Sequence, residues 1–479
     1  METKEKKKKS FGLFNFLNVK QDREEITKDN LYEFIIKKEY NKNQNIVFWS
    51  TFVGYLVFYF TRKQWTMVGT ELINNGILDN NYYATIGLVF SISYGIAKFI
   101  SSPLSDTKSN KWLLSLGLIG AGVLNIAFGF SWTGATATNI ITAVVMSCLI
   151  QVVIGFVHSL GATPSIRFFY NWFNNKQRRN RIITWNVAHN IGSALSTFVI
   201  LGSNVLFSEL LPAELKYLSF FLLPSIISIV IGIFLLFLLK DTPESVGLPP
   251  VKTYYNMELI GVKDQSKTQM DEEKGKPWRY FFVKYVLLNK YVWLLFFVNL
   301  FVYTLRMGLS DWSLLYFKQE YNFDVKAQGK WIYSMFDWGG LILTLIVGLL
   351  TNKHLKRFAP ITSATIGIST FALIGIWTLS DGQSGILSIF MFLAGFIYIP
   401  QCFLPIMVSE FSHYRVVSTA SGLFGMAGYI GDAIMSKVII GMGLYNAQAR
   451  WDAIFIFLIV CGSLAVLLLI PMFNKRHTQ

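Results

Sequence analysis

Cationic side chains inside long apolar segments are the residues of this sequence best suited to chemistry. Arg62, Lys98 and Arg306 lie in such segments, and His189 can add a further positive charge. An Arg or Lys at the centre of a membrane helix costs about 2.5–3.5 kcal/mol on the insertion scale, so it persists where it faces a wet cavity or a partner. We therefore interpret these four residues as the lining of a site for an anion.

The pair of arginines favours phosphate as that anion. A guanidinium group keeps its proton and presents a planar fork that matches two phosphate oxygens, whereas the ammonium group of Lys98 adds a compact charge. Arg62 and Arg306 come from opposite halves of the chain, so they could clamp a phosphate from two sides. Protonation of His189 could tune the affinity for a doubly charged phosphate near neutral pH. Three tyrosines close to the arginines are further candidates for the pore: Tyr55, Tyr59 and Tyr303.

The other ionisable residues in apolar segments have structural interpretations. Lys63 stands at a segment edge and can snorkel to the interface, and we expect His158 to be a packing residue. Asp311 is close enough in sequence to partner Arg306, and Asp337 is a candidate for charge balance. The sequence contains neither a P-loop nor an H-E-x-x-H motif, so we expect no ATP hydrolysis, zinc hydrolysis, cofactor or bound metal. Transport driven by gradients is the remaining class.

The composition requires these side chains to be positioned by membrane-spanning helices. Of the 479 residues, 53% are hydrophobic and only 15% are charged, with a mean hydropathy of +0.43. A mainly soluble enzyme, a disordered protein and a coiled coil are disfavoured by these values. The apolar runs do not alternate with polar residues as strands of a membrane barrel would, so we predict an all-α integral membrane protein. Its three cysteines lie in apolar runs and offer no disulfide framework.

A window of about 20 apolar residues predicts twelve spans in two bundles of six. The expected spans are 46–65, 82–104, 112–131, 138–162, 182–205, 218–239, 291–316, 331–350, 359–379, 385–409, 416–443 and 452–473. We divide the chain accordingly into an N-terminal tail (1–45, with a short interfacial helix near Leu31–Ile36), a first bundle (46–239), a linker (240–290), a second bundle (291–473) and a C-terminal tail (474–479).

The positive charges predict the orientation of these spans. Of 43 Lys and Arg residues, 33 fall in the two tails and in the loops on the same side, and five fall on the other side. This asymmetry indicates that both termini are cytoplasmic, in a plasma or inner membrane. The excess of Lys and Arg over Asp and Glu is then explained by the position of these residues beside the negatively charged surface of the lipid bilayer, and we expect no nucleic-acid partner.

The two halves repeat one another. Tyr59-Phe-Thr-Arg62 in the first span matches Tyr303-Thr-Leu-Arg306 in the seventh, and a small residue followed by a basic cluster recurs after the second helix of each half. Transporters built from such repeats bind their substrate near the midplane, where the halves face each other. We expect the protein to act as a monomer.

At these residues the sequence resembles the organophosphate:phosphate antiporter family of the major facilitator superfamily. The resemblance rests on five strings: Tyr59-Phe-Thr-Arg62-Lys63, Ser93-Tyr94-Gly95-Ile-Ala-Lys98-Phe99, Trp185-Asn186-Val-Ala-His189-Asn190-Ile-Gly192, Asp241-Thr-Pro243-Glu-Ser-Val-Gly247-Leu-Pro-Pro250 and Phe301-Val-Tyr303-Thr-Leu-Arg306-Met-Gly308-Leu-Ser-Asp311-Trp312. It implies twelve helices, a rocker-switch mechanism and a phosphate held by Arg62 and Arg306, with Lys98 and His189 assisting.

Within that family the sequence favours hexose 6-phosphate as the organic substrate exchanged for inorganic phosphate. Gly428-Tyr429-Ile-Gly431-Asp432-Ala-Ile-Met-Ser-Lys437 resembles the hexose-phosphate branch, which has an Asp and a Lys in this helix. Asp432 and Lys437 are five residues apart, about 140° around a helix, so a direct pair between them would need a local distortion. A glycerol 3-phosphate antiporter and a sugar-phosphate sensor remain alternatives, as does a proton- or sodium-coupled sugar transporter, which would use a cavity carboxylate.

Overall fold

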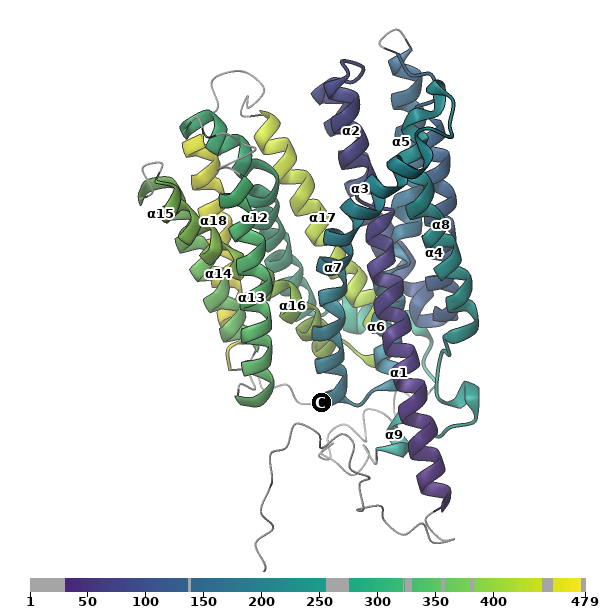
Figure 1. Cartoon of the computed structure of the whole chain (residues 1–479). Helices are drawn as coiled ribbons and strands as arrows, with labels where there is room; N and C mark the ends of the chain where they lie inside the picture. Colours follow the sequence, from purple (N-terminus) through teal and green to yellow (C-terminus); the bar gives the residue numbers. More distant parts are fainter. Residues whose placement is uncertain are drawn as a thin grey trace, which may run out of the picture.

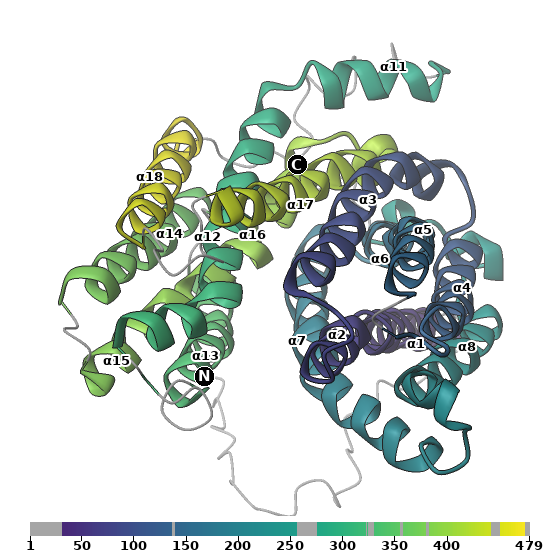
Figure 2. The same cartoon turned by 90° about the horizontal axis from the view of Figure 1, so that it is seen from above.

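The computed structural model describes residues 31–136, 139–255, 275–321, 323, 330–354, 358–379, 383–441 and 451–474. Within these ranges every regular element is a helix, which confirms the predicted all-α class. The remainder of the N-terminal tail and the end of the C-terminal tail lie outside the described residues. The helices form two upright bundles side by side (Figure 1), and the view along their axes separates the bundles clearly (Figure 2).

The first bundle contains the helices that carry Lys98 and His189, and the turn that carries Arg62. Its elements are α1 (Leu31–Phe60), α2 (Gln64–Asn74), α3 (Asn80–Thr107), α4 (Asn110–Phe130), α5 (Ile140–Ser159), α6 (Ala162–Trp172), α7 (Asn175–Phe207), η1 (Ala213–Leu218) and α8 (Ser219–Leu238). Helix α4 packs between α5 and α8, while α1 packs along α7. Glycines permit helices of this bundle to pack closely. A Cβ on Gly232 of α8 would lie only 2.9 Å from the carbonyl oxygen of Ser115 on α4.

The second bundle carries Arg306 and Asp432. Its elements are α12 (Lys290–Tyr321), α13 (Lys330–His354), α14 (Phe358–Ile374), α15 (Ser384–Ala394), α16 (Tyr398–Phe411), α17 (Val417–Gly441) and α18 (Trp451–Leu469). A single turn of 3₁₀ helix, Gly395–Ile397, joins α15 to α16, so the two cover one predicted span. Helix α12 packs against both α17 and α18.

Nine helical segments within the described ranges are long and apolar enough to cross a membrane. Helix α13 contributes a shorter apolar stretch, Trp331–Val347. Helices α1 and α17 occupy the places of the first and eleventh expected spans. A multi-span architecture of two bundles is therefore confirmed, while the count of twelve crossings remains a prediction.

Three boundaries expected from the sequence are wrong. The helix predicted near Leu31–Ile36 is no separate element, because α1 runs without a break from Leu31 to Phe60. Residues 163–181, which separate the expected spans 138–162 and 182–205, are mostly helical rather than a loop, since α6 and the first turns of α7 occupy them. The first span divides after Phe60, and the chain resumes as α2 at Gln64. Hydropathy marks only the part of a helix that lies in lipid, so it misses helical turns that extend into water and does not fix the residue at which a helix ends.

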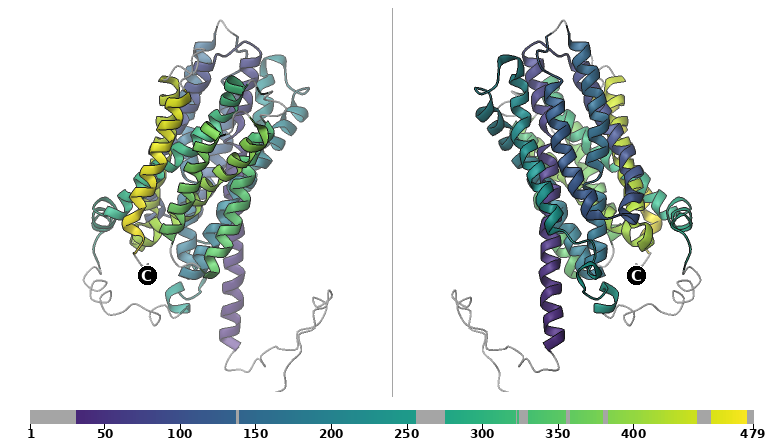
Figure 3. Two further views of the ribbon diagram at one scale, coloured as in Figure 1. Left: turned by 90° about the vertical axis from the view of Figure 1, so that its left-hand side faces the viewer. Right: turned by 90° about the vertical axis from the view of Figure 1, so that its right-hand side faces the viewer.

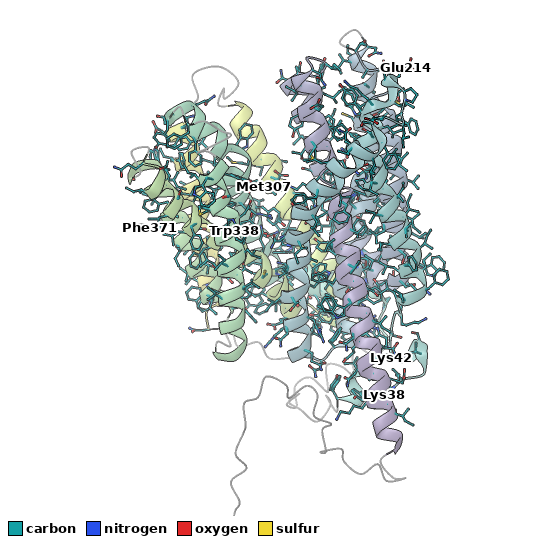
Figure 4. All side chains as sticks on the ribbon, viewed as in Figure 1. Lys38, Lys42, Glu214, Met307, Trp338 and Phe371 are labelled. Atoms are coloured by element: carbon teal, nitrogen blue, oxygen red, sulfur yellow. The ribbon has the colours of Figure 1, made fainter. Side chains whose placement is uncertain are left out.

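The linker is attached to both bundles at one end of the molecule. On the first bundle, the Asp241 carboxylate accepts hydrogen bonds from Ser109 Oγ (2.5 Å) and from the Lys111 backbone N–H (2.9 Å), at the start of α4. The linker helix α9 (Val251–Tyr254) stacks Tyr254 on Tyr40 of α1, with ring centroids 3.9 Å apart. We name this end of the molecule the linker end; α1 extends beyond the other helices there (Figure 3) and carries Lys38 and Lys42, while Glu214 lies at the opposite end (Figure 4).

The other described part of the linker, from Gly275 onward, docks on the second bundle. Its helix α11 (Trp278–Phe282) continues into a π-helical turn, Val283–Leu287. The ring of Phe281 stacks on His413 at 4.6 Å, and Asn289 Nδ2 donates to the carbonyl of Phe411 (2.8 Å). Each described part of the linker is thus fixed to the bundle that adjoins it in sequence.

The bundles meet mainly where α3 crosses α17. These helices run antiparallel in close contact, and glycines on α17 make the contact possible. A Cβ on Gly422 would lie 1.8 Å from Ser102 Oγ, and a Cβ on Gly425 would lie 2.8 Å from Lys98 Cδ. Small residues at helix crossings allow backbones to approach closely, as is common in membrane proteins.

Candidate functional site

A cavity lies between the two bundles, about a third of the way along α3 and α7 from the linker end. The volume open to the centre of a water molecule is ≈ 90 Å³, enough for several waters, since one needs about 10–15 Å³ on this measure. Helices α1, α3, α6 and α7 line it from the first bundle, and α12, α16 and α17 line it from the second. The lining is Tyr55, Tyr59, Lys98, Ala162, Thr163, Ile166, Ile182, Trp185, Asn186, His189, Asn299, Tyr303, Arg306, Gln401, Cys402, Pro405, Ser421, Phe424 and Gly425.

Arg306 is the cation that the second bundle contributes to this cavity. Its Nη1 donates to Gln401 Oε1 (2.9 Å), and its Cζ lies 4.7 Å from the ring centroid of Tyr398. The hydroxyl of Tyr398 donates in turn to Asp337 Oδ1 (2.7 Å). Arg306 Nε is buried and has no hydrogen-bond partner among the residues that the structure describes. The guanidinium is therefore oriented on one side and retains an N–H group for a ligand.

Lys98 and His189 are the cationic candidates that the first bundle contributes. Lys98 Nζ lies 5.4 Å from the ring centroid of Tyr94 and 5.5 Å from that of Tyr429. The Nδ1 of His189 is hydrogen-bonded to the carbonyl of Asn186, while its buried Nε2 has no hydrogen-bond partner in the described ranges. Because Nδ1 can only donate to a carbonyl, Nε2 carries a lone pair in the neutral ring and a proton in the imidazolium. The protonated ring is therefore the form that could bind an anion.

Arg62 lies beside the cavity and is not among its lining residues. It occupies the break between α1 and α2, where its Nη2 donates to the hydroxyl of Tyr429 (2.7 Å). Its Cζ lies 4.9–5.5 Å from the ring centroids of four aromatic residues, which we name the Arg62 cage: Tyr59, Phe90, Tyr94 and Tyr429. Cation–π contacts stabilise a guanidinium in such a desolvated place.

Two tyrosines connect the predicted pair of arginines. The rings of Tyr429 and Tyr303 have centroids 6.1 Å apart, and Arg306 Cζ lies 5.9 Å from the Tyr303 centroid. The structure thus brings Arg62 and Arg306 to the same region of the interface, but only Arg306 lines the cavity. A two-sided clamp on one phosphate remains a prediction.

The three tyrosines expected near the arginines all line the cavity. Tyr55 stacks on Trp185 with ring centroids 4.3 Å apart, and the Tyr59 ring lies 5.9 Å from that of His189. These contacts place aromatic faces along the first bundle's side of the cavity, where a sugar ring could pack.

Asp432, the described member of the Asp432 and Lys437 candidates, lies outside the cavity lining. Asp432 is half-buried on α17, which is regular from Val417 to Gly441 and shows no distortion toward Lys437. The side chains of Lys437 and Asp311 lie outside the described residues. His158 packs in the first bundle, with Nε2 3.1 Å from Thr61 Oγ1 and Nδ1 3.0 Å from the Ile154 carbonyl.

Several uncharged polar residues of the cavity were not identified from the sequence. Asn186 Nδ2 lies 2.7 Å from Cys402 Sγ across the interface, and Gln401 orients Arg306. Asn299 and Ser421 also line the cavity. An Asn or Gln within an apolar run is a sign of such a residue, but it is a weaker sign than a charged residue because burying an amide costs less free energy than burying a charge.

Comparison with known proteins is consistent with this architecture. The family model of the Major Facilitator Superfamily matches residues 47–436. A probable hexose phosphate transport protein of Chlamydia muridarum is 30% identical over 92% of this chain and 94% of its own length. The membrane sensor protein UhpC of Escherichia coli is 28% identical over 88% and 91%, and the hexose-6-phosphate:phosphate antiporter of Salmonella typhimurium is 30% identical over 82% and 81%.

A solved structure shares the fold at low sequence identity. It is that of the proton:xylose symporter XylE bound to 6-bromo-6-deoxy-D-glucose, with a TM-score of 0.64 and 14% identity, and the match covers 91% of this chain and 98% of that one. The chain belongs to the organophosphate:phosphate antiporter family of the Major Facilitator Superfamily. It is a multi-pass membrane protein of a transporter family, and the family resemblance noted in the sequence is confirmed.

Proposed function

We propose that the protein exchanges hexose 6-phosphate for inorganic phosphate by alternating access. The observation that carries this proposal is the convergence of Lys98 and His189 from one bundle with Arg306 from the other around a single cavity. Helices of opposite bundles can both grip a ligand only when it lies between them, which is the arrangement that couples binding to movement of the bundles.

The names of the relatives support a phosphorylated sugar as the substrate class. One is a hexose-6-phosphate:phosphate antiporter and another a probable hexose phosphate transport protein. A glycerol-3-phosphate transporter of Bacillus subtilis is 29% identical, so glycerol 3-phosphate is the second candidate. The polar and aromatic lining beyond the cations favours the larger substrate, because it offers more groups than a glycerol chain can reach.

The interface between the cavity and the linker end supports alternating access. The Asp106 carboxylate of α3 accepts from the backbone N–H groups of Ser418 (3.1 Å) and Thr419 (2.9 Å) at the start of α17. The Tyr170 hydroxyl donates to the carbonyl of Ser409 (2.8 Å), and Arg179 pairs with Glu410. We assign the linker end to the cytoplasm from its positive charge, so these contacts close the cytoplasmic side.

The charges suggest why the carrier would move when loaded. Without an anion, positive groups from the two bundles repel across a cavity of low dielectric constant, so closing the bundles around them is unfavourable. A dianionic phosphate neutralises and bridges them, which lowers the barrier to closure. Such a carrier crosses readily only when loaded, and the outcome is exchange.

Phosphate counterflow in proteoliposomes tests this function. The full chain, loaded with inorganic phosphate, should take up labelled phosphate, and glucose 6-phosphate should compete more strongly than glycerol 3-phosphate. Arg306→Lys and Arg62→Lys should each abolish exchange with normal expression, because Lys cannot reproduce the guanidinium fork. Arg181→Lys is the matched control, since Arg181 lies on α7 outside the cavity, 4.5 Å from the Phe48 ring.

Each alternative predicts a different result in this assay. A sugar-phosphate sensor would bind ligand without counterflow, and an uncoupler would abolish uptake by a proton-coupled symporter. Robust exchange by both lysine variants would contradict the roles proposed for the arginines.

A further inference from the structure

Three buried polar side chains of the second bundle point to a function beyond holding phosphate. Asn299, Gln401 and Ser421 all line the cavity, with exposed fractions of 1%, 8% and 5%. Each carries one polar atom that lacks a hydrogen-bond partner within the described part of the chain: Asn299 Oδ1, Gln401 Nε2 and Ser421 Oγ. A buried polar atom without a hydrogen-bond partner is unfavourable, so a group of three at one cavity indicates a ligand that pairs with them.

The hydrogen-bonding character of two of these atoms is fixed by their neighbours. Asn299 Nδ2 donates to the carbonyl of Phe424 (2.8 Å), which leaves Oδ1 as the free end of the amide. Gln401 Oε1 accepts from Arg306, which leaves Nε2 as the free end. The cavity therefore presents one fixed acceptor and one fixed donor, together with a Ser421 hydroxyl that can do either.

This combination does not suit an anion. A deprotonated phosphate oxygen only accepts hydrogen bonds, so the Asn299 Oδ1 acceptor would repel it. A sugar hydroxyl both donates and accepts, and it can satisfy all three atoms. The set therefore differs in kind from the cations Lys98 and Arg306.

The positions of these atoms fit a ligand that extends from the phosphate site toward the linker end. Asn299 precedes Arg306 by seven residues on α12, so it lies on the same face about 10 Å lower along the axis. Ser421 precedes Gly425, the residue that contacts Lys98, by one turn of α17, again toward the linker end. Gln401 lies between the phosphate site and the two polar atoms nearer the linker end, because one end of its amide contacts Arg306 and the other end is unpaired within the described residues.

We propose that Asn299, Gln401 and Ser421 form a hydroxyl subsite that binds the sugar end of a phosphorylated hexose and selects it over glycerol 3-phosphate. The subsite rests on the proposed function, since it requires that the cavity takes an organic phosphate. A glycerol chain is too short to reach Asn299 and Ser421 while its phosphate contacts Arg306.

The test separates the subsite from the phosphate site by comparing two reactions of the full chain in proteoliposomes. Self-exchange of inorganic phosphate depends only on the phosphate site, whereas competition by glucose 6-phosphate depends on both. Ser421→Ala and Asn299→Leu should each leave self-exchange within about twofold of wild type. Each should raise the glucose 6-phosphate concentration for half-maximal competition about tenfold, which corresponds to about 1.4 kcal/mol. Competition by glycerol 3-phosphate should change by less than twofold.

A control variant and a second substitution separate loss of the subsite from loss of folding. Thr344→Val is the matched control, because Thr344 Oγ1 is also buried without a hydrogen-bond partner in the part of the chain that the structure describes, but lies on α13 outside the cavity lining. If Asn299→Leu does not fold after losing its bond to Phe424, the smaller change Ser421→Ala decides. Equal competition in the variants and in Thr344→Val would overturn the subsite, as would a parallel loss of self-exchange. Wild-type self-exchange without competition by glucose 6-phosphate would also overturn it, whereas absence of self-exchange in wild type would overturn the proposed function itself.

Discussion

Replacing Glu410 by Gln should weaken closure at the linker end. Glu410 at the end of α16 accepts a hydrogen bond from Arg179 Nε on α7, and this pair joins the two bundles. The Glu410 side chain is only 7% exposed, whereas the Arg179 side chain is 34% exposed. The substitution removes the negative charge and nearly preserves the shape, so it tests the electrostatic part of the contact.

The expected size follows from this unequal burial. Breaking a fully buried pair by removing one partner costs about 3–5 kcal/mol. Because Arg179 retains access to water, we expect roughly half of this cost, about 1.5–2.5 kcal/mol. The equilibrium between closed and open linker ends should then shift about 10- to 60-fold toward the open state.

Cys402 provides the measurement. It lies in the cavity lining, while Cys148 and Cys461 can be replaced by Ala to leave it as the single thiol. A membrane-impermeant thiol reagent applied from the linker side should modify Cys402 of the Glu410→Gln protein at least tenfold faster than in the Glu410 background. Glucose 6-phosphate should slow the reaction by occupying the cavity.

Two results would refute this reasoning. An unchanged rate of modification from the linker side would mean that the Arg179–Glu410 pair does not hold the closed state. A faster rate from both sides would indicate general loosening. Glu209→Gln, at the opposite end of the molecule, serves as the matched charge-removal control.

Three further changes test other parts of the structure. Gly422→Ala places a Cβ in the crossing of α3 and α17 and should speed linker-side modification of Cys402 several-fold, whereas Gly367→Ala, with nothing within 4 Å of the new Cβ, should not. Tyr429→Phe removes the hydroxyl that holds Arg62 and should tighten apparent phosphate affinity several-fold in counterflow; weaker binding would contradict the idea that the cage competes with phosphate. Asp241→Ala removes the acceptor at the start of α4 and should lower stability by about 1 kcal/mol, seen as a lower melting temperature in detergent.

The sequence was sufficient for the class and bundle organisation of this fold because apolar length is a strong signal. The sequence predicted the ends of helices and the breaks within them less well, because these depend on contacts outside the lipid. The break that positions Arg62 consists of residues 61–63 and contains neither proline nor glycine, so no turn residue marked it in the sequence. The structure places Arg62 between Tyr59, Phe90 and Tyr429, residues from three different helices.

The residues of the candidate site also differ in how well the sequence predicted them. Charged residues such as Lys98 and Arg306 stand out in an apolar run, and both line the cavity. Asn299, Gln401 and Ser421 carry no charge, so their importance appears only when burial and hydrogen-bond partners are known. Pairwise geometry, such as the aromatic connection between the arginines, is a property of packing that spacing along the chain does not determine.

The aromatic surroundings of Arg62 affect how tightly a carrier should bind its substrate. Since the guanidinium already has a phenolic partner and four ring faces, an arriving oxyanion that drew it inward would exchange one favourable environment for another. The net gain on loading would be the difference between the two, which is much smaller than the full attraction between opposite charges. Moderate retention of this kind allows prompt release on the far side of the membrane, and turnover depends on that release.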